Sequence, residues 1–163
     1  MYIFRGKDKK LNKLKTVFFL IILITFLLII FSCMRDNSGL IDGYYTAEEA
    51  YFNISGWKEY LTICISGGQI ILVEYNAYNP SGFIKSWDLD YKRSMEAFSG
   101  TYPNAYYRYY SRLLLERQNA ENIDALSGAS QSHEIFIVLA EAVLKNAREG
   151  NKETTLVSSW STR

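Results

Sequence analysis

The sequence of 163 residues is poor in the side chains that build disulfide, metal and nucleotide sites. Its two cysteines, Cys33 and Cys64, cannot form a disulfide framework, so an exported domain has to be stabilised by packing. A single histidine, His133, excludes a His-rich metal site, and the two cysteines lack metal-ligand spacing. No G-x-x-x-x-G-K-[ST] phosphate loop and no G-x-G-x-x-G turn occurs. The sequence therefore predicts no bound metal and no nucleotide site of these kinds.

Basic charge is also scarce after the first 33 residues. Those residues hold six of the 18 basic side chains and one of the 17 acidic ones, which leaves 12 and 16 in the remainder. The remainder has a net charge of −4 and no basic cluster, so nucleic acid is excluded as a partner. It is nevertheless rich in aromatic residues, with 13 tyrosines in the whole chain, and this composition is typical of a packed domain.

The N-terminal 33 residues have the layout of an export signal. A basic stretch, residues 1–15, precedes an apolar run, residues 16–31, and the basic end stays in the cytoplasm. The apolar run is short for a bilayer span, which needs about 20 residues. Residues 30–33 (IFSC) resemble a bacterial lipobox, in which Cys33 would be lipidated. The alternative is an uncleaved signal anchor. Either one predicts a bacterial cell-membrane location with the domain on the extracytoplasmic side.

The rest of the chain divides into a short tether and one domain. Residues 34–40 are polar and without periodicity, residues 41–150 contain the patterned segments, and residues 151–163 form a polar tail that we expect to be frayed and solvated. Within the domain, residues 43–52 predict a first strand, followed by turn residues up to Lys58. Residues 60–65 alternate, with Leu61, Ile63 and Ile65 on one face. Cys64, between two of these, is expected to be a buried small side chain.

A hairpin is expected at Ser66-Gly67-Gly68-Gln69, because two glycines tolerate the positive φ angles of a primed turn. It pairs residues 60–65 with residues 70–78, and Asn79-Pro80-Ser81-Gly82 ends the sheet. Three helices should follow. The first carries an apolar stripe and ends at Gly100, with Asp88 and Asp90 at its start. The second runs from Pro103 to about Gln118, and the third from Ser130 to Gly150.

The apolar positions of these helices predict which faces are buried. The expected buried residues are Trp87, Tyr91, Met95 and Phe98 in the first helix, Tyr106, Tyr110, Leu113 and Leu114 in the second, and Ile135, Val138, Leu139, Ala142 and Val143 in the third. Strands followed by segregated helices define an α+β class. We therefore expect a small antiparallel sheet with a hairpin, packed against about three helices and preceded by the N-terminal hydrophobic segment.

The loop before the third helix is the candidate functional site. It reads D-A-L-S-G-A-S at residues 124–130, and Ser130 stands where the helix begins. Free N–H groups and the helix dipole make such a position a seat for phosphate. Ser130 can therefore be a helix cap, or it can carry a phosphoester; the residue types alone favour the cap. Ser130 with His133, three residues later, is better explained by capping than by catalysis.

This loop resembles the flavinylation motif of the FMN-binding domain family. The family pattern is Asp, two variable residues, Ser or Thr, Gly, Ala, and then the Thr or Ser that is esterified, usually Thr. The resemblance implies that FMN is attached covalently through its phosphate to Ser130, with Asp124, Ser127, Gly128 and Ala129 completing the motif. Segments 42–47, 56–58, 73–75 and 140–147 are similar to a lipoprotein branch of that family, described as membrane-anchored major membrane immunogens.

The resemblance implies an electron-transfer module rather than a stand-alone enzyme. Its implied partners are the membrane, a flavin transferase, and membrane or extracytoplasmic electron donors and acceptors. The aromatic residues Tyr44, Tyr45, Trp57, Tyr75 and Trp87 are candidates for stacking on the flavin or for the core. The alternative is a non-redox surface lipoprotein that keeps the fold without covalent flavin and acts as a binding or structural module.

Overall fold

The computed structural model describes residues 15–26 and 39–158. The chain divides into two units, Met1–Asn37 and Ser38–Arg163. In the first unit, residues 15–26 are helical with exposed side chains. Among the described residues, no helix combines the length and the hydropathy needed to cross a bilayer. Residues 27–31 of the predicted apolar run, the lipobox with Cys33, and residues 159–163 lie outside the described residues.

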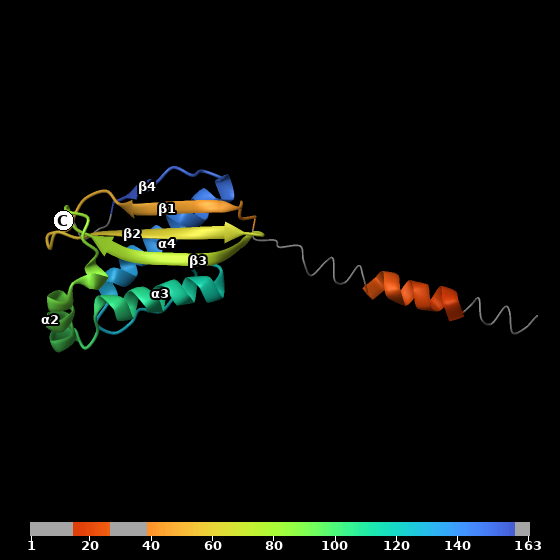
Figure 1. Cartoon of the computed structure of the whole chain (residues 1–163), viewed down its shortest axis with the longest axis horizontal. Coiled ribbons are helices and arrows are strands. Elements are labelled where there is room, and N and C mark those ends of the chain that lie inside the picture. Colours follow the sequence, from red (N-terminus) through yellow and green to blue (C-terminus); the bar gives the residue numbers. More distant parts are fainter. Residues whose placement is uncertain (1–14, 27–38, 159–163) are drawn as a thin grey trace, which may run out of the picture. The chain divides into compact units, whose positions relative to one another are not determined.

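The second unit is built on a four-stranded sheet with the order β3-β2-β1-β4 (Figure 1). The strands are β1 (Gly43–Glu49), β2 (Lys58–Ser66), β3 (Gln69–Tyr78) and β4 (Thr155–Val157). Strand β2 pairs antiparallel with β1 and β3, and β4 pairs parallel with β1. The predicted hairpin between β2 and β3 is confirmed, because Gly67 and Gly68 have φ angles of 61° and 74°. Asp42 supports this turn by accepting from both glycine N–H groups.

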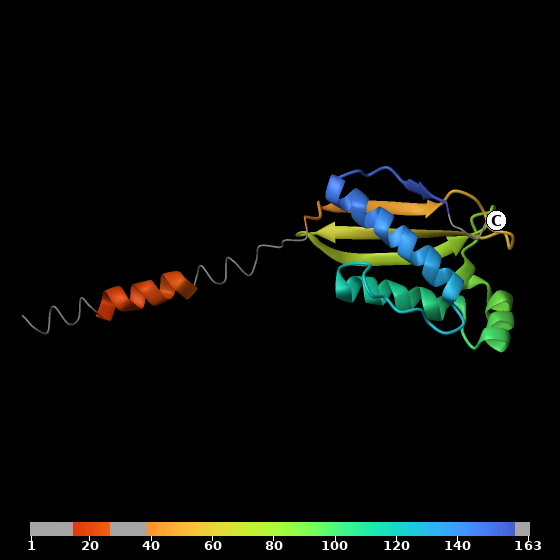
Figure 2. The same cartoon turned by 180° about the vertical axis from the view of Figure 1, so that it is seen from behind.

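The helices segregate from the strands, so the predicted α+β class is confirmed. They are η1 (Lys85–Trp87), α2 (Leu89–Ser99), α3 (Pro103–Arg117) and α4 (Ser130–Glu149). Helix α4 crosses one face of the sheet diagonally, and α3 runs along β3 (Figure 2). The predicted helix ends are confirmed at Gly100 and Gly150, which adopt the left-handed conformation of a C-cap. Asp88 caps α2 by accepting from the Asp90 and Tyr91 N–H groups.

The core lies between this covered face of the sheet and the helices α3 and α4. It is formed by buried side chains on one face of the strands and on the inner sides of the two helices. They are Tyr45, Ala47, Leu61, Ile63, Ile65 and Tyr75 from the sheet, and Tyr106, Tyr110, Leu114, Phe136, Leu139 and Val143 from the helices. Each large apolar side chain buried in this way contributes about 1.5–3 kcal/mol. The predicted face of β2 and the predicted apolar face of α3 are both confirmed.

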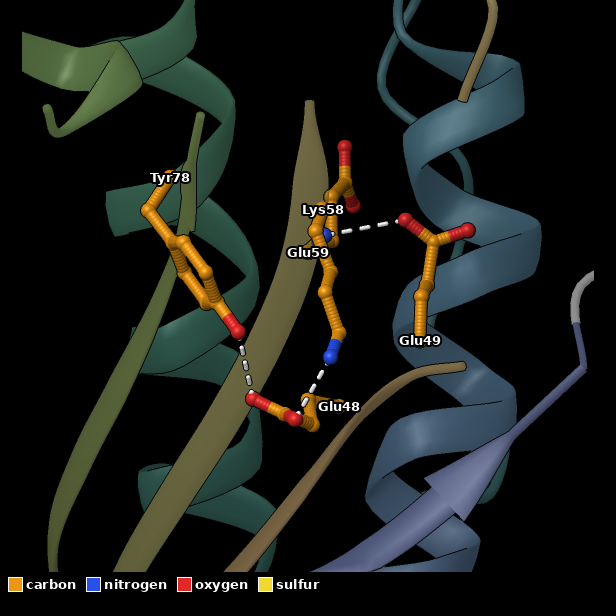
Figure 3. Close-up of polar contacts among 5 residues, drawn as sticks. All are labelled: Glu48, Glu49, Lys58, Glu59 and Tyr78. Atoms are coloured by element: carbon orange, nitrogen blue, oxygen red, sulfur yellow. Dashed lines mark hydrogen bonds and ion pairs between the residues drawn. The ribbon is translucent and has the colours of Figure 1, made fainter. Parts of the chain in front are cut away.

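No described helix covers the opposite face of the sheet, which carries polar side chains together with exposed apolar ones such as Leu72 and Leu156. On it, the Lys58 ammonium donates to the Glu48 carboxylate at 2.6 Å, and the Tyr78 hydroxyl donates to the same carboxylate at 2.8 Å (Figure 3). Thr46 and Thr62 share a hydrogen bond of 2.9 Å across β1 and β2. Cys64 also belongs to this side of β2 and is buried as expected, with 8% of its surface exposed.

The expectations for the tail and for the first helix are wrong in part. The tail is not frayed throughout, because residues 155–157 form β4; Thr155 accepts from the Asn146 side chain at 2.7 Å and Val157 is buried. The stripe on the first helix is not a core face: Trp87 precedes α2, and Phe98 is 95% exposed. This helix covers only an edge of the domain, so its outer positions meet no neighbour.

The buried face of α4 is rotated from the one predicted. Val138 and Ala142 are only partly buried, whereas Phe136, Ala140 and Leu144 are buried. Because α4 crosses the sheet and also contacts β4 and α3, its covered surface is wider than a single stripe.

Candidate functional site

The loop of residues 124–130 approaches the end of α2 so closely that residue 128 has to be glycine. Gly128 has a φ angle of 78°, a conformation that L residues adopt rarely. A Cβ atom at this position would lie 2.5 Å from the backbone oxygen of Ser99 and 3.1 Å from the Thr101 side chain. The glycine of the motif is thus required by local conformation and by packing.

Hydrogen bonds from α3 and α4 fix this loop. The Tyr110 hydroxyl on α3 donates to the Ala129 carbonyl at 3.3 Å and accepts from the Leu126 N–H at 3.0 Å. The Ala129 N–H donates to the Leu126 carbonyl at 2.9 Å, which closes a turn. His133 on α4 bonds through Nε2 to the Ile123 carbonyl at 2.6 Å. The histidine therefore holds the loop and forms no hydrogen bond with Ser130.

Ser130 is the first residue of α4, and its side chain is exposed. The N-cap is Ala129, which has no side chain able to accept from the helix N–H groups. The Ser130 hydroxyl forms no hydrogen bond with any described residue. The interpretation of Ser130 as a helix cap is therefore wrong: the cap position is one residue earlier, and the hydroxyl is left available to solvent.

A cavity of about 120 Å³ adjoins the start of α4. Its walls come from the β1–β2 loop, β2, η1, α2, α3 and α4, with polar groups predominating: Asn53, Ser55, Glu59, Lys85, Tyr91, Tyr106, Gln131 and Ser132, with Met95, Gly128, Ala129 and Ile135. The volume is several times what one water needs but below the range of pockets for whole organic ligands. The cavity therefore suits a small polar group.

Lys85 is a buried cation in this cavity, with 5% of its surface exposed. It forms no ion pair with any described carboxylate. Its ammonium lies 4.8 Å from the ring centroid of Tyr91 and 5.8 Å from that of Trp57. Burial lowers the pKa of Lys85, but the charges of Tyr106 and Glu59 oppose this effect and the net pKa is raised. The ammonium therefore stays charged at neutral pH.

Glu59 is the buried acid of the same cavity, with 2% of its surface exposed. Burial raises the pKa of its carboxyl from the usual 4.5 to about 7, against the lowering influence of Lys85 and Tyr75. Its oxygens accept from the Tyr75 hydroxyl and, at 3.3 Å, from the Ser132 hydroxyl. Its own N–H donates to the Glu49 carboxylate at 2.9 Å (Figure 3).

The Tyr106 hydroxyl is the unsatisfied group of this cavity. Tyr106 has no exposed surface, and its hydroxyl makes no hydrogen bond, although Lys85, Tyr107 and Ser132 are its polar neighbours. Leaving a buried hydroxyl without a partner costs about 1–3 kcal/mol, so such groups in folded proteins call for an explanation.

The structure brings only part of the predicted motif to the cavity. Gly128 and Ala129 line it, whereas Asp124, Ser127 and Ser130 are exposed and do not. Among the aromatic candidates, Tyr45, Trp57 and Tyr75 are buried, and Tyr44 and Trp87 are each 66% exposed. Trp87 lines a second cavity of about 330 Å³ between β3 and α3, which contains no residue of the loop.

The residues that the sequence prediction missed are Glu59, Lys85, Tyr106 as a polar group, and Ser132. Glu59 had a usable signal: it is in phase with Leu61, Ile63 and Ile65, so an acid was placed on the apolar face of β2. Lys85 had none, because it lies in the three-residue helix η1, outside any periodic segment.

The fold and the site define a small α+β domain with one face of its sheet covered by helices and a tight small-residue loop before the long covering helix. No family model matches the chain. The chain belongs to the family of the 15 kDa lipoprotein of Treponema pallidum (strain Nichols), with which it shares 37% identity over 119 residues, 73% of this chain and 84% of the relative.

A solved structure of the same fold is also similar to this chain. The CPE2226 protein from Clostridium perfringens is 40% identical, with a TM-score of 0.71 over 74% of this chain and 98% of the other. The relative's name supports the lipoprotein branch of the resemblance found in the sequence. The resemblance to the FMN-binding domain family rests on the sequence motif and its flanking segments.

Proposed function

We propose that this chain is a membrane lipoprotein, anchored through lipid on Cys33, with its domain on the extracytoplasmic side. The name of the relative from Treponema pallidum and the basic, apolar and Ser32-Cys33 sequence order support this proposal. Lipid adds about 0.8 kcal/mol of membrane affinity for each buried CH₂. Growth with labelled palmitate should label the wild-type chain and leave Cys33→Ala unlabelled, with Cys64→Ala as the labelled control. An unlabelled wild type of full-length mass would favour the signal anchor.

We further propose that the domain carries FMN esterified to Ser130 and transfers electrons. The observation that supports this most directly is the Ser130 hydroxyl, exposed and without a hydrogen bond at the first residue of α4. The N–H groups of the first turn fit a phosphate group, and Lys85 lines a cavity that Gln131 and Ser132 of this turn also line. Flavin supplies the redox chemistry when it is bound, and these protein groups hold and orient its phosphate.

Flavin attachment is tested by the mass of the protein. The wild-type chain produced with a flavin transferase should gain the mass of FMN less water and fluoresce in a denaturing gel. Ser130→Ala should lose both signals, and Ser130→Thr should keep both because it retains the hydroxyl. Wild-type protein from its native host at the unmodified mass would overturn the proposal.

The second candidate is a non-redox surface lipoprotein that acts as a binding or structural module. The relative is named a lipoprotein, and that name mentions no flavin. The 330 Å³ cavity between β3 and α3, which is separate from the loop, would be available to a ligand in such a module. An unmodified mass together with intact lipidation is the result that would favour this candidate.

A further inference from the structure

The cavity beside α4 contains hydrogen-bond donors that the fold does not use. The Tyr106 hydroxyl is fully buried without a partner, and the Lys85 ammonium is buried without an ion pair among the described residues. Both belong to the lining of the same 120 Å³ space. Buried polar groups are normally satisfied, so this combination indicates a missing acceptor.

The start of α4 adds further donors on the same wall. Gln131 and Ser132 line the cavity and belong to the first helical turn, where N–H groups have no intrahelical acceptor. The first intrahelical bond to the cap residue is donated by the His133 N–H to the Ala129 carbonyl at 3.0 Å. The helix dipole favours a negative group at this end, and no acidic residue occupies the first turn.

We propose that this cavity is an oxyanion site for a phosphoryl group, held by Lys85, the Tyr106 hydroxyl and the N–H groups at the start of α4. Its size admits the phosphoryl group and excludes a nucleotide ring system. Ser130 does not line the cavity, so the site does not require covalent attachment. The phosphoryl group has two possible sources: the phosphate of a flavin esterified at Ser130, or a free phosphate or phosphate monoester.

Glu59 is the one carboxylate that lines the cavity, and it makes anion binding dependent on pH. The other titratable groups in the lining are Lys85, Tyr91 and Tyr106, and Glu49 lies behind Glu59. The pKa values of Lys85 and Tyr106 are both raised, so the ammonium stays charged and the Tyr106 phenol stays neutral between pH 6 and pH 8, and Glu59 is the group that changes. Its protonation removes the repulsion, and oxyanion binding should therefore tighten as the pH falls. Sulfate, which does not titrate in this range, isolates the effect of the protein.

The test uses the full chain in detergent micelles, produced without a flavin transferase. Inorganic phosphate and sulfate are titrated at pH 6 and pH 8 by calorimetry, with backbone amide shifts as the local readout. We expect saturable binding, shifts at Gln131 and Ser132, and tighter sulfate binding at pH 6. Lys85→Met and Tyr106→Phe should each weaken binding about tenfold. Lys92→Met is the matched control, because Lys92 also lies over a tyrosine ring, that of Tyr102, but outside the cavity.

Two outcomes would overturn the proposal: no saturable binding to the wild type, or equal binding by Tyr106→Phe, a variant that removes no hydrogen bond and should fold. Ser130→Ala should bind phosphate like the wild type, so a failure of flavin attachment leaves this site standing. The source is decided with flavinylated protein. If that protein no longer takes up free phosphate, the esterified phosphate occupies the cavity; if it still does, the site serves a free phosphate.

Discussion

Lys58 and Glu59 are neighbours on β2 that point to opposite faces of the sheet (Figure 3). Lys58 meets Glu48 and Tyr78 on the open face, where charge and hydrogen bonds match and water is near. Glu59 enters the covered face with Lys85 and Tyr106, where one hydroxyl has no partner and the acid has a raised pKa. The open face is satisfied in its present form, whereas the covered face retains unused binding capacity.

The two faces should differ most in the loss of stability that follows when Glu59 or Glu48 is replaced by alanine. Glu59→Ala leaves the buried Lys85 charge without the carboxylate that helps to raise its pKa, and the Ser132 hydroxyl without an acceptor. We expect a loss of about 3–4 kcal/mol in the free energy of unfolding. Glu48→Ala, on the more exposed face, should cost about 1 kcal/mol. Urea denaturation at pH 7 measures both variants, and similar losses would mean that the two faces do not differ in this way.

The pH dependence of stability should also belong to the covered face. The Glu59 carboxyl binds its proton more tightly in the folded chain than in the unfolded chain, so its contribution to stability is fully present below pH 4.5 and is lost as the pH rises to about 7. A shift of this size corresponds to about 3 kcal/mol. Glu59→Gln should abolish this contribution. Glu48→Gln is the control, and a wild type whose denaturation midpoint is constant from pH 5 to pH 7.5 would contradict the raised pKa.

The backbone beside the covered face should not tolerate an added side chain at residue 128. Gly128 lines the same cavity as Glu59 and has no room for a Cβ atom, whereas Gly82, with a similar φ angle of 81°, has nothing within 4 Å. Gly128→Ala should cost about 2–4 kcal/mol from conformational strain and the clash with Ser99. Gly82→Ala should cost only the strain, about 1 kcal/mol. Thermal unfolding of the two variants separates the two contributions, and equal losses would show that the loop relaxes.

Only some features of the fold could be predicted from the sequence. Local signals were sufficient where one residue type decides the conformation, as at the Gly67-Gly68 hairpin and the Gly100 and Gly150 caps. They failed for β4, because three residues that pair in parallel with β1 have no periodic pattern of their own. Periodicity also could not show that α2 covers only an edge of the domain, and so Phe98 was expected to be buried.

The candidate site, like the fold, could be predicted only in part. The loop of residues 124–130 was found from its residue types, among them Gly128, which the close approach to Ser99 requires. Its surroundings were not found, because Lys85 and Tyr106 reach the cavity from η1 and α3, which are adjacent to α4 only in the folded chain. Glu59 was detectable as a charge in phase with an apolar face of β2, a signal that is more often informative than an exposed charge.

The smallest expected change is in the free energy of unfolding when a tyrosine hydroxyl is removed, and it should have opposite signs on the two faces. Tyr106→Phe removes a buried hydroxyl that makes no hydrogen bond, so the free energy of unfolding should rise by about 1 kcal/mol. Tyr78→Phe removes the hydroxyl that donates to Glu48 at 2.8 Å, so stability should fall by about 0.5–1 kcal/mol. Both are measured by urea denaturation in phosphate-free buffer. Because a bound oxyanion would satisfy Tyr106, adding phosphate should stabilise the wild type more than Tyr106→Phe, and so reduce or reverse the advantage of the variant. A Tyr106→Phe variant that loses stability without phosphate would show that the hydroxyl already has a partner within the fold.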